Sequence, residues 1–392
     1  MNPTENKFQI NIANSRIPQL DGFRGFALCA ALLWHYYACE ITAYSPVLRF
    51  FKPATDMCIM AVDLFFVLSG FLIASILIES KGSPNFFKTF YVRRILRIFP
   101  VYYIVYALFL IGILWGGEQK IPFIFQNSLP DQPIPLWSYA IFAQNFFMDM
   151  DVQRQIYNFG PHFLGITWSV TIEEQFYVLA PLFIWLTPKK YLIRMCCVFI
   201  VACWGVKFAL FGDNIMHTYV TMPARMDSLL MGVIIANLVQ NQEFIQKIFS
   251  MRQPLYILLF VQLILLIALI QWVGNSPWYG FLFTFGGLMW SNCLLLILAD
   301  RNGLLGRFFS IKFFMWLGSI SYTVYLTHQA INGVLHQYIL HQRPIIHYQN
   351  GWYNWKDIAV TLTSLLVSFV ISHYSFKWLE KPLIRKGHSF RY

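Results

Sequence analysis

Arg24 and His35 lie in one apolar stretch, where an ionisable side chain is costly and therefore points to a function. They are eleven residues apart, and eleven helical steps of about 100° return to within about 20° of the start. A helix would direct both side chains to one side, about 16 Å apart in depth at about 1.5 Å per residue. We interpret His35 as a general base and Arg24 as its partner in catalysis. The alternatives are a helix-packing histidine and an arginine that anchors the helix at the membrane surface.

Glu173 and Glu174 begin a second apolar stretch, in the half of the membrane that we expect to hold His35. A carboxylate beside an imidazole holds its tautomer and raises its basicity. Adjacent helix residues point about 100° apart, so at most one of the two faces His35 squarely. We expect one of them to orient His35; the alternative is that they are solvated at the mouth of the helix.

Arg93, Arg94 and Arg97 fall within one helical turn at the start of another apolar stretch. Arginines grip phosphates through paired hydrogen bonds, so this group suits a polyphosphate. We assign the three arginines, together with Arg24, to cofactor binding. The alternative is an ordinary basic anchor at the cytoplasmic membrane edge.

Several further polar residues lie within apolar stretches. Asp63, Arg225 and Asp227 suit either a substrate site or a structural network of ion pairs, and Ser69 precedes a glycine that would let another helix approach. Tyr322 is a candidate donor to an oxyanion, and His328 is a candidate substrate ligand, with helix packing as the alternative for both. We assign to substrate binding Asp63, Ser69, Arg225, Asp227 and His328. The sequence has no metal-ligand spacing and no phosphate-binding glycine loop, so we expect no metal.

The elements that position these residues are membrane helices. Only 12% of the 392 residues are charged, against about 25% in soluble domains, and 57% are hydrophobic. This composition excludes a soluble enzyme, a disordered protein and a disulfide scaffold. The net charge of +11 lies in short basic clusters between apolar runs, which indicates cytoplasmic loops and not nucleic-acid binding.

The sequence predicts an all-α, polytopic membrane helical bundle forming a single domain over residues 1–392. We expect about ten spans, at residues 22–38, 57–78, 97–115, 168–186, 192–211, 220–239, 254–273, 279–298, 313–336 and 357–379. Trp137–Met148 is too short to span and is expected to be re-entrant or on the surface. With ten spans and both termini cytoplasmic, most of the 29 Lys and Arg fall on the cytoplasmic side.

Seven stretches in this order resemble the motifs of the acyltransferase 3 family of membrane O-acyltransferases. The first departs from the family pattern by having Phe23 where Leu is usual. The stretches are Leu20–Gly25, Val62–Leu72, Arg93–Pro100, Trp168–Phe176, Arg225–Asp227, Ser321–His328 and Glu380–Leu383.

The resemblance implies transfer of an acyl group, usually acetyl, from cytoplasmic acyl-CoA to a hydroxyl of a cell-surface glycan or lipid-linked sugar. It implies a bacterial cytoplasmic membrane, with membrane lipid around the protein, and essential roles for Arg24 and His35. We expect no appended soluble esterase-like domain. A proton-coupled transporter, with the same charges as a relay, is the alternative function, and a non-catalytic membrane scaffold is disfavoured by the cost of those charges.

Overall fold

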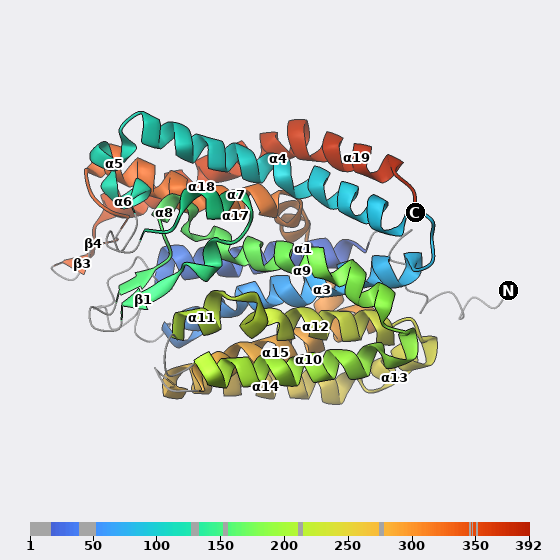
Figure 1. The fold of residues 1–392 in the computed structure, drawn as a ribbon. Coiled ribbons are helices and arrows are strands. Elements are labelled where there is room, and N and C mark those ends of the chain that lie inside the picture. Colours follow the sequence, from blue (N-terminus) through green and yellow to red (C-terminus); the bar gives the residue numbers. More distant parts are fainter. Residues whose placement is uncertain are drawn as a thin grey trace.

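The protein is described here by a computed structural model, which covers residues 17–38, 52–126, 133–151, 156–210, 215–273, 278–344, 346, 348–349 and 352–392. The fold is a helical bundle, as the sequence predicts (Figure 1). A long helix occupies each of the ten predicted stretches. They are α1 (Pro18–Leu33), α3 (Ala61–Ser80), α4 (Phe86–Leu114), α9 (Thr167–Leu186), α10 (Leu192–Leu210), α12 (Met222–Leu238), α14 (Arg252–Val273), α15 (Tyr279–Ala299), α17 (Lys312–Leu340) and α18 (Trp355–Ser375).

Short elements connect or extend these helices. A π-helical turn, η2 (Trp34–Ala38), extends α1, and η6 (Phe376–Glu380) joins α18 to α19 (Lys381–Ser389). Two antiparallel hairpins pair β1 (Asp149–Asp151) with β2 (Ile156–Asn158) and β3 (Tyr348–Gln349) with β4 (Trp352–Tyr353). The other short helices are η3 (Met57–Met60), α5 (Gly117–Lys120), α6 (Pro122–Phe125), α7 (Leu136–Ala140), η4 (Gln144–Phe146), α8 (His162–Gly165), η5 (Lys189–Tyr191), α11 (Ile215–Val220), α13 (Gln242–Ser250) and α16 (Leu304–Phe309).

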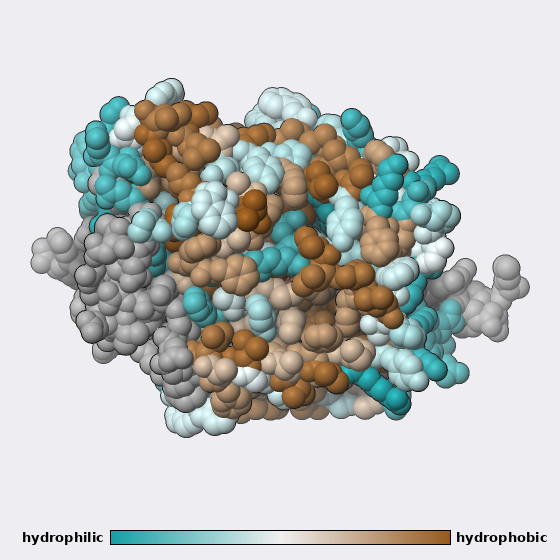
Figure 2. Space-filling view, viewed as in Figure 1, coloured by the Kyte–Doolittle hydropathy of each residue, from teal (hydrophilic) through white to brown (hydrophobic). Residues whose placement is uncertain are grey.

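The two ends of the bundle carry different elements of the chain. The terminal end is where α1 begins and α19 ends, on the right of Figure 1, and the hairpin end carries the four short strands, on the left. Figure 2 shows apolar residues over the middle of the same face, with hydrophilic residues gathered at the terminal end. This distribution fits a protein whose middle lies in lipid.

Within the described residues, six helices are long and apolar enough to cross a membrane, and a bent pair, His217–Leu238 with Gln242–Ser250 at 107°, would make a seventh. Helices α1, α9 and α17 are not among them. Helix α1 has only 16 residues, and all three helices carry polar residues of the site described below. The structure thus confirms a polytopic helical membrane protein, while the count of ten spans and the cytoplasmic termini stay predictions.

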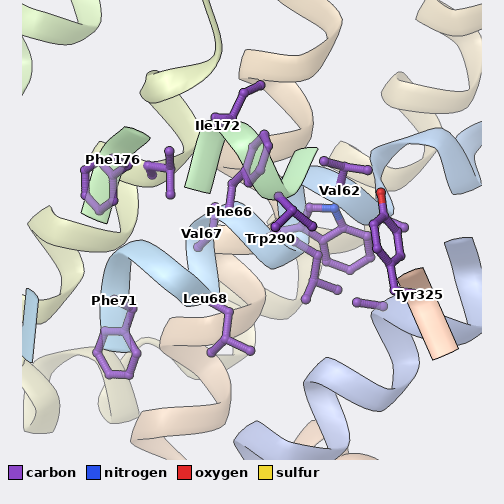
Figure 3. Packing of buried hydrophobic residues seen from close by; sticks show 14 of the residues in the cluster. Val62, Phe66, Val67, Leu68, Phe71, Ile172, Phe176, Trp290 and Tyr325 are labelled. Carbon is purple, nitrogen blue, oxygen red and sulfur yellow. The ribbon is translucent and has the colours of Figure 1, made fainter. Parts of the chain in front are cut away.

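Helix α3 lies at the centre of the packing. Figure 3 shows its residues Val62, Phe66 and Phe71 in the same buried cluster as Ile172 of α9 and Tyr325 of α17. The close approach expected at Ser69-Gly70 is confirmed, because a methyl group on Gly70 would collide with the carbonyl oxygen of Leu229 on α12.

The short apolar stretch 137–148 does not form a span. It holds α7 and η4, which are separated by a turn at Phe142 with φ of 55°. Gln144 and Asn145 point inward, where Gln144 Nε2 donates to Thr167 Oγ1 at 3.0 Å and Asn145 Nδ2 donates to the Val220 carbonyl at 3.1 Å. The side chains of Trp137, Ile141 and Phe146 are exposed on the bundle.

Candidate active site

A cavity of about 580 Å³, lined by both charged and apolar side chains, opens inside the bundle near the terminal end. Helices α1, α3, α4, α9 and α17 surround it, and η6 and α19 complete the wall. Its farthest lining residues toward the hairpin end are Val62 on α3, Ser169 on α9 and Tyr325 on α17. The Ser169 and Tyr325 hydroxyls are 2.7 Å apart and hydrogen-bonded.

Three of the four arginines assigned to a phosphate line this cavity: Arg24, Arg94 and Arg97. Arg24 Nη1 lies 3.7 Å from the carboxylate of Asp21. Arg94 lies over the ring of Tyr177, with its guanidinium carbon 5.5 Å from the ring centroid. Three guanidinium groups on one cavity fit an anionic ligand such as a pyrophosphate.

Arg93 does not line the cavity with the other three arginines, and its assignment to cofactor binding stays a prediction. Its Nη2 donates to the carbonyl of Phe390 at 2.6 Å, and its guanidinium lies 4.8 Å from the ring centroid of Tyr392. Arg93 is adjacent to Arg94 and so points about 100° away from it on the helix. Its role in the structure is to fasten the end of the chain to α4.

Glu173 and Glu174 both line the cavity. Glu173 accepts hydrogen bonds from Ser69 Oγ at 2.9 Å and from Tyr177 Oη at 2.8 Å. Glu174 is buried, and its Oε1 has no hydrogen-bond partner within the described chain. Such an acceptor, buried beside Arg94 and Tyr322, is available to a ligand group that carries a hydrogen.

His35 lies beyond the cavity and is not among its lining residues. Its Nδ1 is 2.7 Å from the amide nitrogen of Gln329, and its ring centroid is 5.1 Å from that of His328. Both partners follow Tyr325 on α17, so His35 lies on the hairpin side of Tyr325 and Glu173 on the terminal side. The expected carboxylate partner of His35 is therefore corrected to Gln329.

His328 is fully buried beside His35. Its Nδ1 donates to the carbonyls of Tyr325 at 2.8 Å and Val324 at 3.1 Å, and the hydroxyl of Tyr36 donates to the His328 carbonyl at 2.9 Å. Because carbonyls only accept, the hydrogen of the neutral ring is on Nδ1 and the lone pair is on Nε2. No described residue hydrogen-bonds to this Nε2.

His162, to which the sequence assigned no role, comes close enough to His35 and His328 to interact with both electrostatically. It lies on the short helix α8 in the connection before α9. Burial, with the neighbouring His328, lowers the pKa of His162 to about 4, so this imidazole is neutral at pH 7. A four-residue helix is too short to show a helical pattern of apolar residues, so the sequence contains no signal that His162 lies close to His35.

Tyr322 and Ser69 line the cavity and do not meet His35. The Tyr322 hydroxyl donates to the carbonyl of Ile98 at 3.1 Å. The Ser69 hydroxyl donates its hydrogen bond to Glu173. Tyr322 can therefore contact a ligand in the cavity, and it becomes an oxyanion donor only if the reacting carbonyl lies on the terminal side of Tyr325.

Asp63, Arg225 and Asp227 lie in a buried network of ion pairs, while their assignment to substrate binding stays a prediction. Arg225 Nη2 pairs with Asp63 Oδ1 at 3.1 Å, and Lys207 Nζ pairs with Asp227 Oδ2 at 2.6 Å. These side chains are at most 1% exposed and none lines the cavity. The pairs join α3 to α12 and α10 to α12.

The cavity also holds residues that the sequence reasoning did not single out as site residues. Lys381 and Arg385 line its mouth, and Glu380 Oε1 accepts from Thr323 Oγ1 at 2.7 Å. The signal was present in the Glu-Lys-Pro-Leu motif that follows the last span. That motif alone does not show that the helix following the last span lines the cavity.

Comparisons with known proteins identify the family of the chain. A family model described as an acyltransferase domain matches residues 17–373. O-acetyltransferase OatA of Staphylococcus aureus is 26% identical over 391 residues, which cover 95% of this chain and 58% of OatA. The Bacillus subtilis protein with the provisional name peptidoglycan O-acetyltransferase YrhL is 24% identical over 386 residues, covering 95% and 55% of the two chains.

The chain thus spans little more than half the length of these curated relatives. No solved structure matches it significantly. The family match extends from the start of α1 almost to the end of α18 and includes every wall of the cavity except η6 and α19. With this coverage, the chain belongs to the acyltransferase 3 family of integral-membrane acyltransferases.

Proposed function

We propose that this protein is a membrane O-acetyltransferase of the bacterial cytoplasmic membrane. It takes an acetyl group from cytoplasmic acetyl-CoA and transfers it to a hydroxyl of a cell-surface glycan or lipid-linked sugar. Family membership and the names of the relatives, one of which is given for peptidoglycan, support the reaction class. The terminal end, with its basic residues, then faces the cytoplasm.

The observation that carries the proposal is the cavity lined by Arg24, Arg94 and Arg97. It opens at the terminal end and reaches along α17 toward the pair formed by His35 and His328. From Tyr322 to Gln329 is seven residues, or about 10 Å at about 1.5 Å per residue. A donor that is anchored by its phosphates and carries its thioester on a long flexible arm suits this layout.

In the proposed reaction, His35 accepts the proton of the acceptor hydroxyl, and the hydroxyl oxygen attacks the thioester carbonyl. The carbon–sulfur bond then breaks, and the proton passes to the departing thiolate of CoA. In the resting structure Gln329 Nε2 faces His35 Nδ1, which leaves the ring hydrogen on Nε2. Base action at Nε2 therefore requires Gln329 to turn its amide oxygen toward Nδ1–H.

The hydrogen bond between Ser169 and Tyr325 closes the cavity on the side of His35. For the thioester to meet His35, the Tyr325 side chain has to swing aside when donor and acceptor are bound. An acetyl group carried transiently on His35 is the rival route. Rapid-quench trapping of labelled protein without acceptor would support that rival.

The test is glycan mass spectrometry of a deletion strain complemented with wild type, His35→Ala or His373→Ala. His373 is an exposed histidine on α18 and serves as the matched control. We expect wild type and His373→Ala to restore one acetyl mass per modified sugar and His35→Ala not to restore it. Restoration by His35→Ala would exclude His35 as the base, and no acetyl difference for any strain would exclude the proposed reaction.

A further inference from the structure

Helix α19 presents one basic face to the cavity. Lys381, Arg385 and His388 are spaced by four and three residues, which places them on one side of a helix, and all three line the cavity with Ile384 between them. Lys386, in the same helix, is exposed and does not line it. The helix is therefore built with a specific face toward the mouth of the cavity.

The position of α19 is fixed by bonds to the start of α4. Thr89 Oγ1 donates to the carbonyl of Arg391 at 2.9 Å, and Arg93 donates to the carbonyl of Phe390. The same α4 carries Arg94 and Arg97 on the cavity wall. Helices α4 and α19 thus both contribute cations to one cavity. The contacts of Arg93 keep the two helices in a fixed position relative to each other.

The cations on the two helices have no close ion-pair partner within the described protein. Arg97, Lys381 and Arg385 form no ion pair with any residue that the structure describes. Glu380 lines the same cavity and lies close enough to Arg97 to interact with it electrostatically, but it forms no close ion pair and accepts hydrogen bonds from Thr323 and Ser375. Lys381 and Arg385, which are exposed at the cavity mouth and form no close ion pair, suit the binding of a multiply charged anion.

We propose that the basic face of α19 binds the phosphomonoester at the nucleotide end of the donor, while Arg94 and Arg97 bind the pyrophosphate. This assignment rests on the proposed acetyl-CoA reaction. The thioester has to point into the bundle, so the far end of the donor, which carries the 3′-phosphate on the ribose, stays at the mouth. Lys381 and Arg385 are the exposed members of the group, whereas Arg94 and Arg97 are half-buried.

The kinetic test compares acetyl-CoA with 3′-dephospho-acetyl-CoA as donors for purified wild type, Lys381→Gln/Arg385→Gln and Lys386→Gln. We expect wild type and Lys386→Gln to have a KM about tenfold or more lower for acetyl-CoA, since hydrogen bonds to charged groups are strong. The double variant should lose most of this preference through KM, with kcat unchanged. Retention of the full preference by the double variant would overturn the assignment.

A binding measurement separates this inference from the proposed reaction. Adenosine 3′,5′-bisphosphate and adenosine 5′-monophosphate are titrated into the same three proteins without donor or acceptor. Weaker bisphosphate binding by Lys381→Gln/Arg385→Gln than by Lys386→Gln, with unchanged monophosphate binding, supports the subsite even if no acetyl transfer is found. Equal bisphosphate binding by these two variants would refute the subsite even if acetyl transfer is found.

Discussion

The imidazole rings of His35 and His328 lie 5.1 Å apart between centroids, one on the extension of α1 and the other on α17. The hydrogen bonds of His328 Nδ1 to two carbonyls of its own helix leave its Nε2 lone pair free to accept a hydrogen bond. An acceptor sugar that approaches His35 would meet this lone pair with one of its hydroxyl groups. The role of His328 in acceptor binding, which the sequence suggested, remains a prediction.

For His328 we expect the Leu variant to raise the KM for the acceptor by about tenfold, because it removes a hydrogen-bond acceptor at a buried site. His328→Gln carries an amide oxygen near the position of Nε2 and should recover part of the loss. Steady-state kinetics with acceptor varied at saturating acetyl-CoA measures this. If His328 only packs against its neighbours, His328→Leu and His328→Gln would have equal effects on activity, and neither would change the KM for the acceptor selectively.

Gln329 offers a direct test of the state of His35. A carboxylate can only accept, so Gln329→Glu fixes the hydrogen of the neutral His35 ring on Nδ1 and leaves the Nε2 lone pair free. We expect Gln329→Glu to keep or increase kcat, and Gln329→Leu to lower it by about 10-fold or more by releasing the ring. Single-turnover rates at saturating donor and acceptor give the comparison. If Gln329→Glu lowers kcat as much as Gln329→Leu does, the result would argue against general-base action by His35.

The ion pair between Asp63 and Arg225 should matter to stability. Asp63→Ala leaves a fully buried guanidinium without its carboxylate, which typically costs about 3–5 kcal/mol. The double variant Asp63→Leu/Arg225→Met removes both charges and should regain most of that loss. Thermal unfolding of the purified proteins in detergent measures the difference. If the double variant is as unstable as Asp63→Ala, the two side chains do not act as a pair.

Gly70 allows α3 and α12 to approach, and Gly205 on α10 provides the control. An added methyl at Gly70 meets the backbone carbonyl of Leu229, whereas one at Gly205 meets nothing within 4 Å. We expect Gly70→Ala to destabilise the protein by about 1–3 kcal/mol through overpacking. Gly205→Ala should be neutral or slightly stabilising, because alanine is the better helix former. Equal melting temperatures for the two variants would contradict the close crossing.

The sequence predicted the helices well because each predicted span is a long apolar run, and such a run in a membrane satisfies its own backbone hydrogen bonds only as a helix. It also placed Arg24, Arg94 and Arg97 in one cavity, because basic residues at the start of two helices that begin at the same end lie close in depth. These two inferences need only spacing and polarity.

The partners of His35 were not predictable in the same way. Helical geometry predicts the direction of a side chain and its depth in the membrane. Glu173 was a candidate partner of His35 because the two were expected at a similar depth. Which neighbouring helix supplies the contact depends on packing, and α17 supplies Gln329 and His328 there. Likewise Arg225 and Asp227 look the same in sequence whether or not they pair with Asp63 and Lys207, and only the packing of the helices shows these two ion pairs.

The layer made by Ser169 and Tyr325 has a consequence for the cell as well as for the reaction. A water-filled passage from the arginines to His35 would let protons and small ions leak across the bilayer and dissipate the membrane potential. The hydrogen-bonded pair of hydroxyls interrupts that passage at rest. Under the proposed reaction, a large hydrophilic donor would enter deep into the membrane while the permeability barrier stays intact.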